Sequence, residues 1–177
     1  VDVAALKAEF LYQYQKENGI SFRTRLFADN VKYNKLGSLM PSVTNMLLNT
    51  SLAKRFIGVA VERSIPKLAQ TTTLKWYKKH RDQLVKKQYS KGQVYLFIDE
   101  FTNFYDDIIG RDCIEALSKL GYEVIITDHK ESGRSFISKG LLDEAKQLAN
   151  QNIDFFKDKI HADAPLVGIE PSALLTF

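Results

Sequence analysis

The stretch "VYLFID", Val94–Asp99, decides the fold class of this 177-residue chain. It is a short apolar run rich in strand-forming residues, which is typical of a strand buried on both faces of a sheet. Two other runs have the same character, "YEVIIT" at residues 122–127 and "PLVGIE" at residues 165–170. The three runs therefore predict three short strands.

Helical patterns fill both intervals between these runs. The first interval carries apolar residues at spacings of three and four and closes at Gly121, while the second helix begins near Ser138 and reaches Ile160. This alternation predicts an α/β fold with a short three-stranded parallel sheet and right-handed crossover helices. Because three strands leave sheet edges to cover, we interpret the region as an incomplete domain.

The segment before the sheet is predicted to be all-helical. In "VDVAALKAEFLYQYQKENG", Asp2 can cap a helix that Gly19 ends, and the pattern at Ser21–Gly37 predicts a second helix. Short helical pieces, an irregular connector around Pro66 and a basic helix at residues 75–91 follow.

The two regions differ in charge. Residues 1–93 hold 17 Lys and Arg against 6 Asp and Glu, a net charge of +11, whereas residues 94–177 hold 8 against 15, a net charge of −7. The overall value of +4 hides this asymmetry. We therefore predict a helical region at residues 1–92 and an α/β region at residues 93–177, with the boundary near Gly92.

The composition excludes several classes of protein. The single cysteine, Cys113, cannot form an internal disulfide or a multi-thiolate site, and its apolar helical surroundings indicate a core residue. The first residues include Asp2 and Lys7, where a signal peptide needs apolar residues. The uncharged run Leu36–Ala53 is too polar to span a membrane. A soluble protein of the reducing cytoplasm, without transmembrane segments, is expected.

Polar side chains follow each predicted strand, where ligands of open parallel sheets bind. Carboxylates, one histidine and one arginine would suit a divalent metal or a phosphate, whereas the wet loops that end strands would carry the same residues without any ligand. The sequence lacks the histidine spacings of a zinc site, so no metal is expected. The candidates are Asp99, Glu100, Thr102, Asn103, Asp128, His129, Glu131, Ser132, Arg134, Glu170, Pro171 and Ser172.

The segment "ESGRS" at residues 131–135 places one glycine before a predicted helix. Free backbone N–H groups at such a turn can hold an anion. The segment matches neither G-x-G-x-x-G nor G-x-x-x-x-G-K-[ST], and helix capping by Ser135 or Ser138 explains it equally well.

The basic helix at residues 75–91 interleaves lysines with Trp76, Tyr77 and Tyr89. Such a pattern is compatible with a nucleic-acid patch. It is equally typical of a helix that packs its aromatic residues inward and presents lysine to water, here toward the acidic second region. We favour the second interpretation and do not expect a nucleic-acid partner.

Four stretches carry a resemblance to a known family. "FIDEFTNFYDDIIGRDCIEALSKLGYEV", "GRSFISKGLLDEAKQLANQNI" and "PLVGIEPSALLTF" resemble the first half of the cysteine-rich CCG domain at the C-terminus of bacterial FAD-linked oxidases with iron–sulfur domains. The iron–sulfur subunits of glycolate oxidase and glycerol-3-phosphate dehydrogenase, and heterodisulfide reductase, are similar. "LKAEFLYQYQKENGISFRTRLFADNVKYNKLGSL" resembles the helical segment that follows the ferredoxin module in the fused oxidases.

The family's thiolates are replaced in this chain. In the family the turn after the second strand reads Cys-Cys-Gly-Arg, and the third strand ends in Glu-Pro-Ser-Cys. The matching residues are Glu131, Ser132, Gly133 and Arg134 in the turn, and Glu170, Pro171, Ser172 and Ala173 after the third strand. Because soft thiolates select iron–sulfur clusters, the resemblance implies a degenerate ligand loop and no cofactor in this fragment.

The resemblance also implies a parent protein that is longer than this chain. That parent would use FAD and iron–sulfur clusters to oxidise a 2-hydroxy acid of the glycolate or lactate type. Its flavin and ferredoxin domains would be partners of this fragment, which would be inactive alone and serve as scaffold, docking surface or wall of the electron path. A homodimer through the exposed sheet edge is a further expectation.

Two other functions stay open at this point. The first is a non-catalytic interaction module that uses the basic helix at residues 75–91. The second is a small metal- or phosphate-binding α/β enzyme, for which Asp99, Asn103 and His129 form a possible polar pocket together with Arg134 and Glu170.

Overall fold

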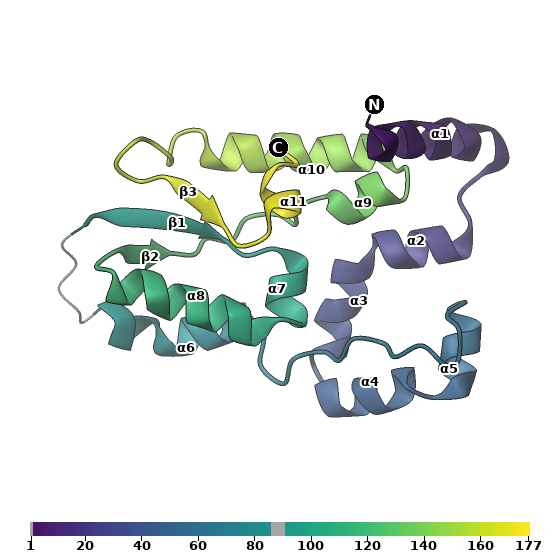
Figure 1. The fold of residues 1–177 in the computed structure, drawn as a ribbon, viewed down its shortest axis with the longest axis horizontal. Coiled ribbons are helices and arrows are strands. Elements are labelled where there is room, and N and C mark those ends of the chain that lie inside the picture. Colours follow the sequence, from purple (N-terminus) through teal and green to yellow (C-terminus); the bar gives the residue numbers. More distant parts are fainter. Residues whose placement is uncertain (1, 86–90) are drawn as a thin grey trace.

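The computed structural model describes residues 2–85 and 91–177 of the chain (Figure 1). Within these ranges three parallel strands form one sheet in the order β2-β1-β3. The predicted α/β fold with a short three-stranded parallel sheet is confirmed. The strands are β1 (Gln93–Phe97), β2 (Glu123–Ile125) and β3 (Leu166–Gly168).

Eleven helices accompany the sheet in the described residues. They are α1 (Val3–Asn18), α2 (Phe22–Ala28), α3 (Asn30–Gly37), α4 (Pro41–Leu48), α5 (Ser51–Phe56), α6 (Thr73–Val85), α7 (Glu100–Phe104), α8 (Asp107–Lys119), α9 (Arg134–Ser138), α10 (Leu142–Phe156) and α11 (Pro171–Leu174). None of these helices combines the length and the apolar character that a membrane crossing requires.

Helices cover both faces of the sheet (Figure 1). On one face α6 and α8 pack against alternate residues of β1, and Tyr77, Leu96 and Ile114 are buried there in one cluster. On the other face α10 and α11 contact Phe97, which is buried with Phe156 and Ala173. Because successive strand residues point to opposite faces, the continuous apolar run of β1 supplies both cores.

The basic helix α6 is part of the α/β layer. Its Tyr77 is buried and the phenol donates a hydrogen bond of 2.9 Å to the Val124 carbonyl of β2. Lys78 and Lys79 on the same helix are exposed. Tyr89, Lys86 and Lys87, which the sequence pattern places in the basic helix, lie outside the described residues. The structure therefore does not test a nucleic-acid role for the whole stretch.

Helix α1 is hydrogen-bonded to the turn between α9 and α10 and to the first turn of α10, which come much later in the sequence. Gln15 donates a hydrogen bond of 2.7 Å to the Lys139 carbonyl, and the Tyr12 hydroxyl lies 2.9 Å from the Asp143 carboxylate. Gly140 permits the approach, because a Cβ atom built on it would lie 2.5 Å from Cβ of Leu11. Its φ of +70° also favours glycine.

Two predicted helices differ from those in the structure. The helix expected at Ser21–Gly37 breaks at Asp29, where the Asn30 amide donates to the Phe27 carbonyl at 3.2 Å and to the Ser135 hydroxyl at 2.6 Å. The helix expected from Ser138 to Ile160 is shorter in the structure, because α10 begins at Leu142 and ends at Phe156. A separate short helix that was not predicted, α9, precedes it across the turn that contains Gly140. The break at Asp29 brings the helical region against the segment that follows β2.

Candidate functional site

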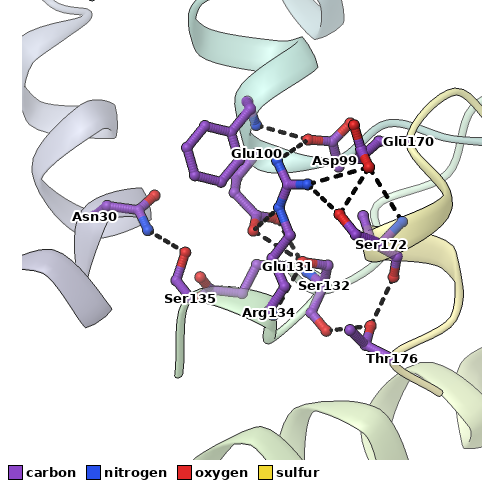
Figure 2. A network of polar contacts seen from close by, with 12 residues as sticks. Asn30, Asp99, Glu100, Glu131, Ser132, Arg134, Ser135, Glu170, Ser172 and Thr176 are labelled. Carbon is purple, nitrogen blue, oxygen red and sulfur yellow. Dashed lines mark hydrogen bonds and ion pairs between the residues drawn. The ribbon is translucent and has the colours of Figure 1, made fainter. Parts of the chain in front are cut away.

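The loops after the three strands meet at the C-terminal edge of the sheet (Figure 2). Asp99 and Glu100 begin α7 after β1, Ser132 and Arg134 belong to the loop and helix after β2, and Ser172 lies in α11 after β3. Parallel strands place their carboxyl ends on one edge, which is why residues so distant in sequence become neighbours.

Arg134 is the centre of this cluster. Its guanidinium lies 3.6 Å from Asp99 Oδ1, 3.8 Å from Glu100 Oε1 and 3.6 Å from Glu170 Oε1. It also lies 4.2 Å from the centroid of the Phe101 ring. Asp99 and Glu100 are each 2% exposed at the side chain, so one arginine offsets much of the charge of two buried carboxylates.

Neutral donors satisfy the remaining acceptor atoms of these carboxylates. Asp99 caps α7 by accepting hydrogen bonds from the backbone N–H groups of Phe101 and Thr102, and from the Thr102 hydroxyl. Glu100 accepts from the Ser132 amide at 3.1 Å and from its hydroxyl at 2.8 Å. The carboxylates therefore have a complete set of internal partners, which favours a structural role.

The loop after β2 is held by hydrogen bonds that use its own polar atoms. The fully buried Ser132 accepts from the Arg134 amide at 3.2 Å through its hydroxyl, while its carbonyl lies 2.6 Å from the Thr176 hydroxyl. Gly133 follows with φ of +83°, the left-handed conformation that starts α9. Ser132 Oγ is thus engaged as both donor and acceptor.

Ser172 links the loops after β2 and β3. Its hydroxyl accepts a hydrogen bond of 2.6 Å from Arg134 and donates one of 2.7 Å to Glu170. The hydroxyl and amide of Ser172, with Arg134, hold the pKa of Glu170 below its ordinary value. The adjoining Pro171 starts α11, and Ala173 is buried in the core with no polar side-chain atom.

Glu131 has a different environment from the other carboxylates. Its Oε2 atom is buried and has no hydrogen-bond partner among the described residues. Burial, followed by the charge of Glu100, raises the pKa of Glu131 to about 7. The side chain is therefore largely protonated in mildly acidic solution.

Both ring nitrogens of His129 are engaged by backbone groups. Its Nε2 accepts from the Ile98 amide at 3.2 Å, so the ring proton of the neutral form lies on Nδ1, which is 2.7 Å from the Lys130 carbonyl. Burial lowers the pKa of His129, and the ring stacks on Phe97 with centroids 4.0 Å apart. Both nitrogen atoms are engaged, so neither is free to bind a metal.

Asn103 also turns away from the Arg134 cluster. Its Oδ1 accepts a hydrogen bond of 3.1 Å from the Leu74 amide at the start of α6. The structure therefore groups Asp99, Arg134 and Glu170, but it uses Asn103 and His129 to join other segments.

The residues of the loop do not fit an iron–sulfur cluster. The Ser132 hydroxyl already donates to Glu100 and accepts from the Arg134 amide, and Ala173 has no ligand atom. The single cysteine lies elsewhere, in α8. Burial raises the pKa of the Cys113 thiol, which opposes thiolate formation. Over residues 2–85 and 91–177, no group of three or more His, Cys, Asp or Glu side chains is arranged to hold a metal ion.

A pocket of about 720 Å³ opens beside the cluster, between the helical region and the α/β region. Sequence reasoning missed it, because its walls come from segments about a hundred residues apart that no local pattern connects. Of these residues only Arg134 and Ser172 were site candidates. Ser135 and Ser138 were considered as helix caps, but neither side chain caps α9 or α10 in the structure. The lining residues are Phe27, Asn30, Ile65, Pro66, Phe101, Tyr105, Asp106, Arg134, Ser135, Ser138, Lys139 and Ser172.

Comparison with known proteins gives relatives of one name. The whole chain is similar to the D-2-hydroxyglutarate dehydrogenases of Pantoea ananatis, with 27% identity, and Escherichia coli, with 23% identity, each over 189 residues. The chain spans 18% of the length of each. A dehydrogenase of the same name from Haemophilus influenzae is 31% identical over 84 residues, which are 46% of this chain and 8% of that protein. No family model and no solved structure matches the chain.

Proposed function

We propose that this chain is a domain of an FAD-linked dehydrogenase that oxidises a D-2-hydroxy acid of the 2-hydroxyglutarate type. The observation that carries the proposal is the similarity of all 177 residues to two D-2-hydroxyglutarate dehydrogenases. In the parent, the flavin would accept the hydride and pass electrons to iron–sulfur clusters, because cofactors carry such chemistry and the protein positions them. The proposed substrate is thus a 2-hydroxyglutarate-type acid, in place of the glycolate or lactate type that the sequence alone led us to expect.

The domain itself would be a scaffold with a repurposed ligand loop. The position of the family's thiolates holds the Arg134 cluster, whose ion pairs and hydrogen bonds join the loops after all three strands. A network with its acceptors satisfied internally stabilises a structure but leaves few groups for catalysis. The chain alone would hold neither flavin nor iron and would not oxidise the substrate.

A row of exposed apolar side chains on α1 supports a docking role. Val3, Leu6, Phe10 and Tyr14 recur at helical spacing and are 73%, 60%, 68% and 53% exposed. The opposite side of α1 is occupied by the contacts to α9 and α10. Because most of each relative lies outside the segment that this chain matches, the row would pack against the flavin-carrying part of the parent.

Purification of the full polypeptide that carries this chain tests the proposal. We expect a flavin absorption spectrum that is bleached by D-2-hydroxyglutarate under anaerobic conditions and unchanged by the L-enantiomer. Alanine at Ser132 should leave the iron content of that polypeptide unchanged, because the loop holds no cluster. Absence of flavin, or a flavin that D-2-hydroxyglutarate does not reduce, would contradict the assignment.

A further inference from the structure

The pocket between the helical and α/β regions has the size and lining of a small-molecule site. Its volume of about 720 Å³ falls in the range of roughly 300–1,000 Å³ that such sites occupy. Phe27 of α2 forms part of one wall, and Phe101 and Tyr105 form part of another. Aromatic walls with a few polar groups favour a planar, largely apolar body.

The positive charge in this pocket is distributed unequally. Lys139 lines it with its ammonium 5.1 Å from the centroid of the Phe27 ring, and no carboxylate among the described residues pairs with that ammonium. Burial, with the nearby charges of Lys7 and Arg23, lowers the pKa of Lys139. An anion placed against Lys139 would relieve this repulsion between cations.

The side of the pocket near α7 has the opposite character. Arg134 is already surrounded by Asp99, Glu100 and Glu170, so the three carboxylates exceed its single positive charge. Asp106, which follows α7, adds another carboxylate to the lining. A second anionic group on the ligand would therefore be repelled there, which selects a monoanion over a dianion.

Asn30 adds an acceptor to the lining. Its amide nitrogen donates to the Ser135 hydroxyl (Figure 2) and to the Phe27 carbonyl. Its Oδ1 atom is buried and has no partner in the described part of the chain. A hydroxyl or N–H group on the ligand would satisfy this atom.

We propose that this pocket binds a small planar monoanion, an aromatic carboxylic acid or a molecule of the same chemistry, with its carboxylate at Lys139 and its ring against the Phe27 wall. The site is separate from the oxidation of the 2-hydroxy acid, because 2-hydroxyglutarate carries two carboxylates and no planar apolar body. The proposal therefore stands or falls independently of the proposed activity.

The test uses the full polypeptide that carries this chain and 2-naphthoate as a fluorescent probe. Its uncharged isostere 2-naphthamide measures the contribution of the carboxylate, and the dianion naphthalene-2,6-dicarboxylate, which keeps the ring, measures the selection against a second charge. We expect saturable binding of 2-naphthoate, with 2-naphthamide and the dicarboxylate each bound at least about tenfold more weakly, a difference of about 1.4 kcal/mol.

Substitutions at Lys139 locate the probe. Lys139→Met should weaken 2-naphthoate binding about tenfold and leave 2-naphthamide binding unchanged, while Lys139→Arg should keep most of the affinity. Lys146→Met removes an exposed lysine of α10 that does not line the pocket and is the matched control. Thermal unfolding of each variant identifies a folding defect. Equal binding of acid and amide, no binding at all, or equal effects at Lys139 and Lys146 would overturn the proposal.

Discussion

Arg134 donates a hydrogen bond of 2.6 Å to the hydroxyl of Ser172, which joins the loop after β2 to the helix after β3. Through the same guanidinium the loop also meets Asp99 and Glu100 at the start of α7. Three segments that are separated by more than thirty residues along the chain are thus closed around one side chain.

Replacement of Arg134 by methionine should destabilise the fold. The substitution keeps most of the side-chain volume but leaves Asp99 and Glu100 buried without their cation, a change that costs about 3 kcal/mol in comparable buried pairs. Urea unfolding of the two proteins measures this difference in the free energy of unfolding. Arg134→Lys should recover only part of it, because an ammonium cannot replace the planar fork of donors.

An exposed ion pair supplies the control for that experiment. Lys119 and Glu115 pair on α8 at 3.1 Å, with side chains that are 67% and 45% exposed. Lys119→Met should cost less than about 1 kcal/mol. Similar losses in the two methionine variants would show that the Arg134 cluster contributes no more than a surface pair.

The raised pKa of Glu131 predicts a pH dependence of stability. Between the ordinary carboxyl value of 4.5 and about 7, the folded chain binds a proton at Glu131 that the unfolded chain has released. The contribution of Glu131 to the free energy of unfolding is therefore fully present below about pH 4.5 and is lost as the pH rises toward about 7. Glu131→Gln should remove this decline, so the difference in unfolding free energy between variant and wild type should grow across that interval.

A matched substitution separates Glu131 from carboxylates in general. Glu62 is exposed in the segment after α5, so Glu62→Gln is the control that makes the same chemical change at a surface position. A difference between Glu131→Gln and the wild type that does not change from pH 4.5 to 7 would mean that the Glu131 carboxyl group is solvated in the folded chain.

The sequence predicted the order of the elements better than their contacts. Continuous apolar runs such as Val94–Ile98 can only be satisfied between two helical layers, so the sheet and its crossovers were correctly expected. The division of the Ser21–Gly37 helix was not, because the contact that holds it joins Asn30 to Ser135, 105 residues away. Local patterns do not contain such a contact.

The same reasoning applies to the site. Strand ends correctly indicated where polar residues gather, and Asp99, Arg134 and Glu170 do lie together. The direction of each side chain depends on tertiary packing, however. The His129 ring instead accepts a hydrogen bond from the backbone amide of Ile98, directly after β1. The pocket was invisible for a related reason, since Phe27 and Arg134 come from opposite regions of the chain.

Gly140 should be intolerant of a side chain because α1 packs directly over it. Gly140→Ala would place Cβ 2.5 Å from Cβ of Leu11 and 2.8 Å from the Tyr12 amide nitrogen. Gly19 has a similar positive φ of +79° but open space around it, so Gly19→Ala reports the backbone strain alone. We expect Gly140→Ala to lower the free energy of unfolding by about 1–3 kcal/mol more than Gly19→Ala. Equal losses would show that α1 can shift without cost.

The exposed row of apolar side chains on α1 should contribute to packing within the full polypeptide but little to the stability of this domain. Leu6→Glu with Phe10→Glu replaces two side chains that are 60% and 68% exposed, so the unfolding of this domain should change by no more than about 0.5 kcal/mol per site. In the full polypeptide the same pair should weaken packing on the flavin-carrying part and speed release of this domain by a protease. Gln13→Ala, at another exposed position of α1, is the control. Unchanged release by the double variant would mean that the row faces solvent in the parent, and the docking surface would then have to lie elsewhere on the helical region.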